Sequence, residues 1–204
     1  MKVTGIEPCS KTKYKISLDG KFAFVLYKGE LSRFHIREGE ELSEETKQKI
    51  YSDVLLKRAK LRALHLLSDM DRTENALREK LRLGLYPQEI IDAAVEYVRS
   101  FGYLNDARYA ENFVRSRQGM KSRREIRAQL LQKGVPSEMI DDAFEACGEE
   151  GGEADAIRRL LEKKRFDPVC ADEREIQRLY GYLARKGFSY ETVRQVIQNY
   201  EVDA

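Results

Sequence analysis

The most restrictive feature of this sequence is an internal repeat, in which one pattern of apolar and turn residues occurs three times. The copies begin at Leu77, Ile126 and Leu179, so the second follows the first by 49 residues and the third follows the second by 53. Matching residues recur at offsets of 4, 8, 9, 10, 12, 13 and 14 positions from these three. Such a repeat indicates a chain of similar supersecondary units, each packing mainly on its neighbours.

The residues of each copy predict a helix, a tight turn and a second helix. Thr73 and Ser122, each four residues before the first position of its copy, are typical N-caps, and Glu125 is placed to complete a capping box with Ser122. Gly134 and Gly187 supply the left-handed residue that commonly ends a helix. Apolar periodicity predicts one further helix before each copy, over 58–67, 107–117 and 154–164. Each copy is therefore expected to be a three-helix bundle.

The first copy departs from the others at its turn, because Leu85 stands where they have glycine. Leucine is strained in the left-handed conformation, so we expect this turn to move to the neighbouring Gly84. Pro87 and its counterpart Pro136 then lie at the start of the next helix, each with a glutamate two residues later that favours the positive end of the helix dipole.

The N-terminal segment has a different pattern. Two runs of β-forming residues, 14–18 and 22–27, flank Asp19-Gly20, which is a strong hairpin signal, and helical sequence resumes at about Ser43. We therefore predict a mainly α fold of three tandem three-helix-bundle repeats, preceded by a small β-hairpin-containing module that folds separately. The expected domains are residues 1–50 for this module and 51–104, 105–148 and 149–204 for the repeats.

The sequence contains no recognisable motif for catalysis or for binding a cofactor. It contains neither a phosphate-binding loop nor a nucleophile elbow nor a zinc-protease motif, and its carboxylates are mostly interleaved with Lys and Arg as on solvated helix faces. Cys9, Cys147 and Cys170 lie far apart, while His35 and His65 each stand alone, so we expect free thiols and no metal site. We predict that the chain is not an enzyme and needs no cofactor.

Charge and hydropathy bear on location and partners. The 37 basic and 35 acidic side chains nearly cancel, and no run of 18 apolar residues or secretory signal is present, so we expect a cytoplasmic protein without membrane contact. One stretch is strongly basic, with seven cations and a single acid, and is a candidate surface for phosphate. Its cations, the predicted binding residues, are Arg115, Arg117, Lys121, Arg123, Arg124, Arg127 and Lys133.

Three segments resemble a known family. Residues 102–117 and 126–135 look like the central repeat of RecX proteins, and residues 71–81 look like the first, so the resemblance covers roughly 57–197. The N-terminal segment is similar to an extension found in some members. The resemblance implies a monomeric regulator that binds the RecA filament on single-stranded DNA. It also implies that the protein restrains ATP hydrolysis, strand exchange and repressor self-cleavage by RecA.

Two other classes of function stay open at this point. Three-helix units with a glycine turn are shaped like helix-turn-helix domains, so the chain can instead be a DNA- or RNA-binding protein that acts alone. A structural scaffold that binds no nucleic acid is the second alternative. Binding to RecA and to DNA, measured separately, distinguishes these classes from a RecA regulator.

Overall fold

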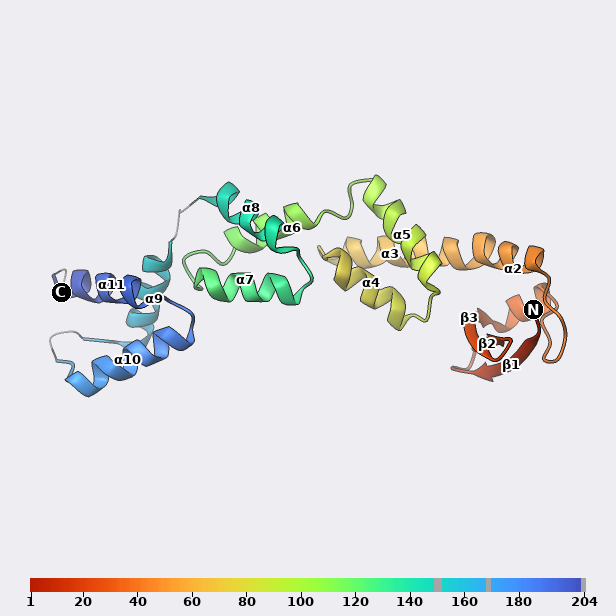
Figure 1. The fold of residues 1–204 in the computed structure, drawn as a ribbon, viewed down its shortest axis with the longest axis horizontal. Coiled ribbons are helices and arrows are strands. Elements are labelled where there is room, and N and C mark those ends of the chain that lie inside the picture. Colours follow the sequence, from red (N-terminus) through yellow and green to blue (C-terminus); the bar gives the residue numbers. More distant parts are fainter. Residues whose placement is uncertain (149–151, 168–169, 203–204) are drawn as a thin grey trace. The chain divides into compact units, whose positions relative to one another are not determined.

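The computed structural model describes residues 1–148, 152–167 and 170–202, which form two compact units, Met1–Asn105 and Asp106–Ala204 (Figure 1). The first unit contains a three-stranded sheet, the helices of the N-terminal segment and the first repeat. The second contains the other two repeats. The strands are β1 (Val3–Pro8), β2 (Lys13–Leu18) and β3 (Lys21–Tyr27). The helices of unit 1 are α1 (Lys28–Arg33), α2 (Glu44–Ile50), the π-helical segment η1 (Tyr51–Leu56), α3 (Lys57–Asp69), α4 (Glu74–Leu83) and α5 (Gln88–Ser100). Those of unit 2 are α6 (Asp106–Arg115), α7 (Arg123–Gln132), α8 (Ser137–Cys147), α9 (Glu153–Lys164), α10 (Glu173–Arg185) and α11 (Tyr190–Val202).

The predicted hairpin is confirmed and belongs to an antiparallel sheet of order β1-β2-β3. Asp19 and Gly20 both have positive φ, 48° and 79°, as the tight turn between two twisted strands requires. Strand β1 was not predicted from the sequence. This strand carries Gly5 and ends at Pro8, two residues that are unfavourable in strands, so its local pattern is weak.

The boundary predicted at residue 50 falls inside one helical run, from α2 through η1 to α3. Ser43 caps this run by accepting a hydrogen bond from the Thr46 amide, so the helix begins where it was expected to resume. Sheet residues and repeat residues share one hydrophobic core, which includes the contact between the rings of Phe24 and Tyr51 at 5.9 Å. The domain boundaries stay a prediction, but this shared core leads us to revise the expectation that the N-terminal module is separable.

The predicted fold class, tandem three-helix repeats behind a small β-containing module, is confirmed. Each repeat of unit 2 has its own hydrophobic cluster. Most matched apolar positions lie in the cores, although Met139 remains 38% exposed. The boundary predicted between residues 148 and 149 adjoins 149–151, which lie outside the described residues. The buried residues at the first two positions of the three copies are Leu77, Leu81, Ile126, Leu130, Leu179 and Leu183.

The turn of the first repeat does not move to Gly84, so that expectation is wrong. Leu85 itself adopts the left-handed conformation, with φ of 60°, as Gly134 and Gly187 do in the other repeats. In this geometry the amide of Tyr86 bonds to the carbonyl of Leu81, and the Tyr86 side chain packs against the core. A shifted turn would take Tyr86 out of register, so the packing of this half-buried residue on the core overrides the preference of leucine.

The left-handed Leu85 predicts a stabilising substitution. Leu85→Gly is expected to raise the free energy of unfolding by about 1 kcal/mol, because a left-handed residue with a Cβ costs about 1–2 kcal/mol and the extra freedom of glycine in the unfolded chain offsets part of this gain. Gly134→Ala, the reciprocal change, is expected to destabilise unit 2 by a similar amount. Urea titrations of both variants test this, and a loss of stability in Leu85→Gly would mean that the leucine side chain contributes more than the strain costs.

Candidate partner-binding groove

The structure divides the predicted basic stretch by what its side chains contact. Lys121 and Arg127 form ion pairs within their own repeat. Lys121 lies 2.7 Å from Glu125, whose carboxylate also accepts a hydrogen bond from Gln129. Arg127 bonds both carboxylate oxygens of Asp141, and this hydrogen bonding lowers the pKa of the Asp141 carboxyl below its ordinary value. These two cations stabilise the repeat and present little free charge.

Three further cations of the stretch lie against aromatic rings of the second repeat. The guanidinium of Arg117 lies 3.6 Å from the Phe113 ring centroid, and the ammonium of Lys133 lies 5.8 Å from the same ring. Arg123 lies 4.4 Å from the ring of Phe144. Such cation–π contacts hold the side chains in place.

The last two cations, Arg115 and Arg124, are exposed and form no ion pair among the described residues. Arg124 lines a groove of about 650 Å³ between α7 and the end of α10, together with Tyr182, Arg185 and Lys186. Its one acidic lining residue, Glu125, is the partner of Lys121. We call this the inter-repeat groove. Its three cations form no ion pair within the described part of the chain, so it carries net positive charge.

The third-repeat side of this groove was not predicted from the sequence. Lys186 directly precedes the turn glycine of its copy, as Lys133 does in the second, so the repeat alignment contained a signal for it. Tyr182 adds an aromatic face, on which the ammonium of Lys164 lies at 4.2 Å from the ring centroid. Sequence proximity to the basic stretch could not reveal these residues, because they lie far along the chain.

The two repeats meet at one buried residue beside the groove. Ser122 is the predicted N-cap of α7, accepting a hydrogen bond from the Glu125 amide, and its hydroxyl also donates to the Lys186 carbonyl at 2.7 Å. Glycine is required opposite it. Gly187 has φ of 91°, and a Cβ there would lie 2.8 Å from the Ser122 hydroxyl oxygen. The contact holds Arg124 and Lys186 on facing walls of the groove.

Ser122→Ala is therefore expected to cost more than the loss of an ordinary cap. Removing an N-cap costs about 0.5–2 kcal/mol, and the unpaired Lys186 carbonyl adds roughly 1 kcal/mol. Ser43→Ala is the matched control, since Ser43 caps α2 at an exposed position. Chemical denaturation should show a loss about twice as large for Ser122→Ala. Equal losses would mean that the bond between the repeats contributes nothing to stability.

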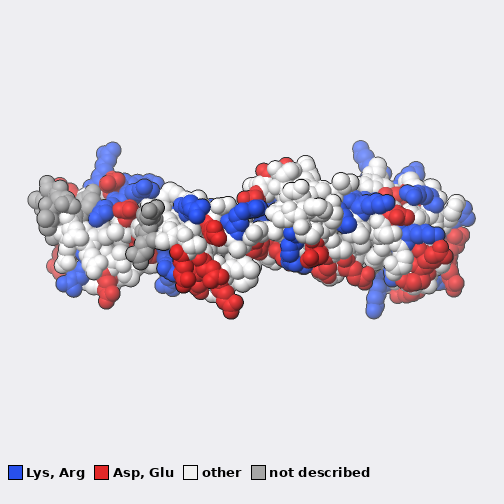
Figure 2. Space-filling model, turned by 90° about the horizontal axis from the view of Figure 1, so that it is seen from above, with Lys and Arg blue, Asp and Glu red and all other residues white. Residues whose placement is uncertain are grey.

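Basic and acidic side chains are interspersed on the face drawn in Figure 2. In the parts of the chain that the structure describes, no helix is long and apolar enough to span a bilayer. Within the same parts, no three His, Cys, Asp or Glu side chains gather in a way that would hold a metal ion.

Comparison with known proteins identifies the family. Three regions match the family models described as the first, second and third three-helix domains of RecX, at residues 59–97, 105–143 and 152–197. A protein named Regulatory protein RecX from Caldanaerobacter subterraneus subsp. tengcongensis is 34% identical over 187 residues, which cover 91% of this chain and 92% of that protein. The chain belongs to the RecX family. The resemblance noted in the sequence is thereby confirmed.

Other RecX proteins agree with this assignment. Regulatory protein RecX from Trichlorobacter lovleyi is 37% identical over 142 residues, covering 68% of this chain and 92% of its own length. A crystal structure titled regulatory protein RecX superposes with a TM-score of 0.65 at 30% identity, covering 96% of this chain and 98% of that one. RecX from Lactobacillus salivarius, 22% identical, shares the fold over 72% of this chain with a TM-score of 0.61.

Proposed function

We propose that this chain binds the RecA filament on single-stranded DNA and inhibits its ATPase, strand-exchange and repressor-cleavage activities. The observation that carries the proposal is the presence of all three RecX three-helix domains in one chain. Proteins of similar sequence along nearly the whole chain bear the name of regulatory protein. A regulator of this kind acts by binding, in the cytoplasm, where recombination takes place.

The arrangement of charge supports a binding function. Hydrogen bonds from arginine lower the carboxyl pKa of both Asp92 and Asp141, as in surface ion pairs. A catalytic acid and base would instead have one pKa raised and the other lowered. Arg115 and the cations of the inter-repeat groove instead offer charge to a partner. We propose that they contact phosphates or an acidic RecA surface, while Lys121 and Arg127 support α7, which carries Arg124.

The test is a triple variant of the groove, Arg124→Gln, Arg185→Gln and Lys186→Gln, in a RecA ATPase assay on single-stranded DNA. The half-inhibiting concentration should rise roughly tenfold or more, because three charge contacts of about 0.5–1 kcal/mol each are lost. Salt should weaken the wild type more than the variant, since each phosphate contact contributes about 0.7 to the log–log slope on single strands.

The matched control removes three other exposed cations, by Lys49→Gln, Arg82→Gln and Arg158→Gln, whose ion pairs are with neighbours on their own helices. It lowers the net charge equally and should inhibit like the wild type. Full inhibition by the groove variant would remove the inter-repeat groove from the proposal. If the wild-type protein leaves RecA unaffected and binds duplex DNA with sequence preference, the helix-turn-helix alternative is correct.

A further inference from the structure

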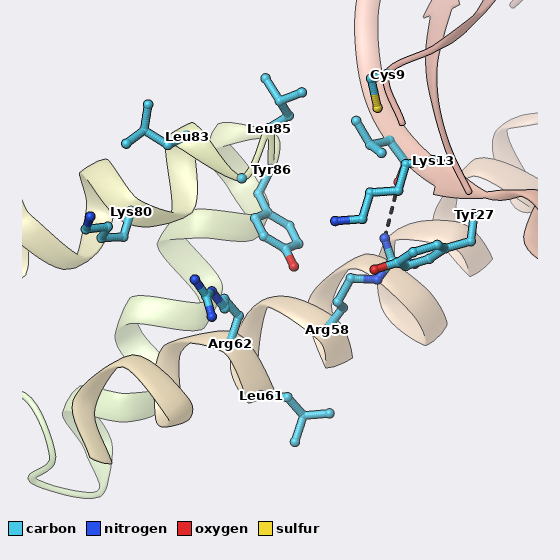
Figure 3. Close-up of a pocket in the computed structure, with 12 residues that line it drawn as sticks. Cys9, Lys13, Tyr27, Arg58, Leu61, Arg62, Lys80, Leu83, Leu85 and Tyr86 are labelled. Atoms are coloured by element: carbon cyan, nitrogen blue, oxygen red, sulfur yellow. Dashed lines mark hydrogen bonds between the residues drawn. The ribbon is translucent and has the colours of Figure 1, made fainter. Parts of the chain in front are cut away.

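A second basic cavity, of about 840 Å³, lies within unit 1 between the N-terminal sheet and helices α3 and α4 (Figure 3). Of its twelve lining residues four are basic and none is acidic. Lys13 reaches it from β2, Arg58 and Arg62 from α3, and Lys80 from α4. Like charges brought together from three separate elements repel one another unless an anion lies between them.

Among the described residues, only one of these cations forms an ion pair. The Arg58 guanidinium forms an ion pair with Glu30 at 2.5 Å, and both side chains are largely buried. Lys13, Arg62 and Lys80 are exposed, and within the described residues none of them forms an ion pair. The cavity therefore carries about three uncompensated positive charges, which a polyanion would match.

Two tyrosines share the cavity with these cations. Arg58 and Lys13 lie 4.5 and 5.4 Å from the ring centroid of Tyr27. Burial raises the pKa of the Tyr86 hydroxyl, and the nearby charges of Arg58 and Arg62 act to lower it. In Figure 3 Lys13 extends toward the Tyr86 ring, and the hydroxyl groups of both tyrosines point into the space between them. Aromatic and cationic groups thus face the same ligand volume.

The apolar part of the lining distinguishes among anions. Leu61 and Leu83 line the cavity and are 68% and 74% exposed. An inorganic anion gains nothing from such a surface, whereas a nucleic-acid strand places phosphates on cations and flat bases on aromatic and apolar side chains. Only a strand with unpaired bases presents their faces in this way.

We propose that this cavity binds single-stranded nucleic acid, with phosphates on Lys13, Arg62 and Lys80 and a base against Tyr86. The proposal rests on the function proposed above and deepens it, because the chain would then bind the DNA of the filament directly. It also gives the N-terminal sheet a role, since Lys13 and Tyr27 belong to β2 and β3.

The first test measures binding of a fluorescent oligothymidylate to the full chain without RecA. Arg62→Gln with Lys80→Gln should weaken binding roughly tenfold and lower the log–log salt slope by about 1.4, which is about 0.7 for each lost phosphate contact. Lys57→Gln with Arg82→Gln is the matched control. It removes two exposed cations from the same helices, α3 and α4, that pair with Asp53 and Glu79 outside the cavity, and it should bind like the wild type.

The second test locates the base. An oligonucleotide carrying 5-iodouracil is irradiated with the full chain, and the crosslinked peptide is mapped by mass spectrometry. Crosslinking at Tyr86 supports the proposal, and Tyr86→Leu should remove it. Unchanged affinity of the Arg62 and Lys80 variant, or crosslinks confined to unit 2, would overturn the proposal. So would displacement of the oligonucleotide by polyglutamate or by dTTP at equal phosphate or carboxylate concentration, because the cavity would then select anions without regard to a strand.

RecA inhibition, measured with the same two variants, separates this proposal from the function on which it rests. A chain that binds the oligonucleotide through the cavity yet leaves RecA unaffected contradicts the proposed function alone. A chain that inhibits RecA while the cavity variant binds the oligonucleotide like the wild type contradicts the cavity alone.

Discussion

Removal of residues 1–42 is expected to abolish the cooperative unfolding of unit 1, although it leaves every helix of the first repeat in the chain. Ile16, Phe24 and Leu26 are fully buried in the same cluster as Ile50 and Leu55. Burying a large apolar side chain contributes about 1.5–3 kcal/mol, so the loss of three removes about 5–9 kcal/mol, which approaches the 5–15 kcal/mol that stabilises a whole domain. Scanning calorimetry should show the transition of unit 2 and no other.

A pair of neighbouring phenylalanines tests the same core without a deletion. Phe24→Ala should destabilise unit 1 by about 3–5 kcal/mol, because this side chain is fully buried. Phe22→Ala, on the same strand but 48% exposed, should cost far less. If the shortened chain still unfolds cooperatively at an unchanged midpoint, the N-terminal module is separable after all, as the sequence pattern first predicted.

Leu130→Ala is expected to lower the free energy of unfolding of unit 2 by about 2–5 kcal/mol. Leu130 is fully buried at the second matched position of its copy, within the cluster that also holds Ile126 and Ile140. The substitution leaves a cavity that the surrounding helices fill only in part, which adds to the lost transfer free energy. Urea denaturation followed by circular dichroism measures the effect.

The adjacent Leu131 provides the control, since it is 48% exposed on the same helix. Leu131→Ala removes the same atoms and should cost well under half as much. Alanine is the better helix former, and the half-exposed leucine side chain loses less buried apolar surface than Leu130 does. A larger loss for Leu131→Ala than for Leu130→Ala would show that the repeat alignment assigns the wrong face of α7 to the core.

Features that depend on a few consecutive residues were predictable from the sequence. The Asp19-Gly20 turn, the Ser43 and Ser122 caps and the left-handed Gly134 and Gly187 all satisfy backbone groups within four or five residues. The repeat predicted the tandem bundles for a related reason. Apolar side chains at helical spacing must all find a common interior, and three similar spacings require three similar bundles.

The partners of the cations in the basic stretch were not predictable from the sequence. Seven cations close together in the sequence were predicted as one surface, yet Arg127 pairs with Asp141, Arg123 lies on Phe144, and only Arg124 reaches the inter-repeat groove. Neighbours along a helix point in directions 100° apart, so a cluster in the sequence spreads around the helix and meets different partners. Charge composition alone does not report which partners these are.

The kind of unit, the number of copies and the residues that begin and end most helices follow from the sequence, because caps, turns and apolar periodicity act over short distances. Three features depend on the folded chain: the left-handed Leu85, the bond from Ser122 to the Lys186 carbonyl, and the grouping of Lys13 with Arg62. Each of these depends on which distant segments share a core. Which distant segments share a core depends on how side chains pack across elements. Such contacts produce no periodic pattern in the sequence of the residues involved.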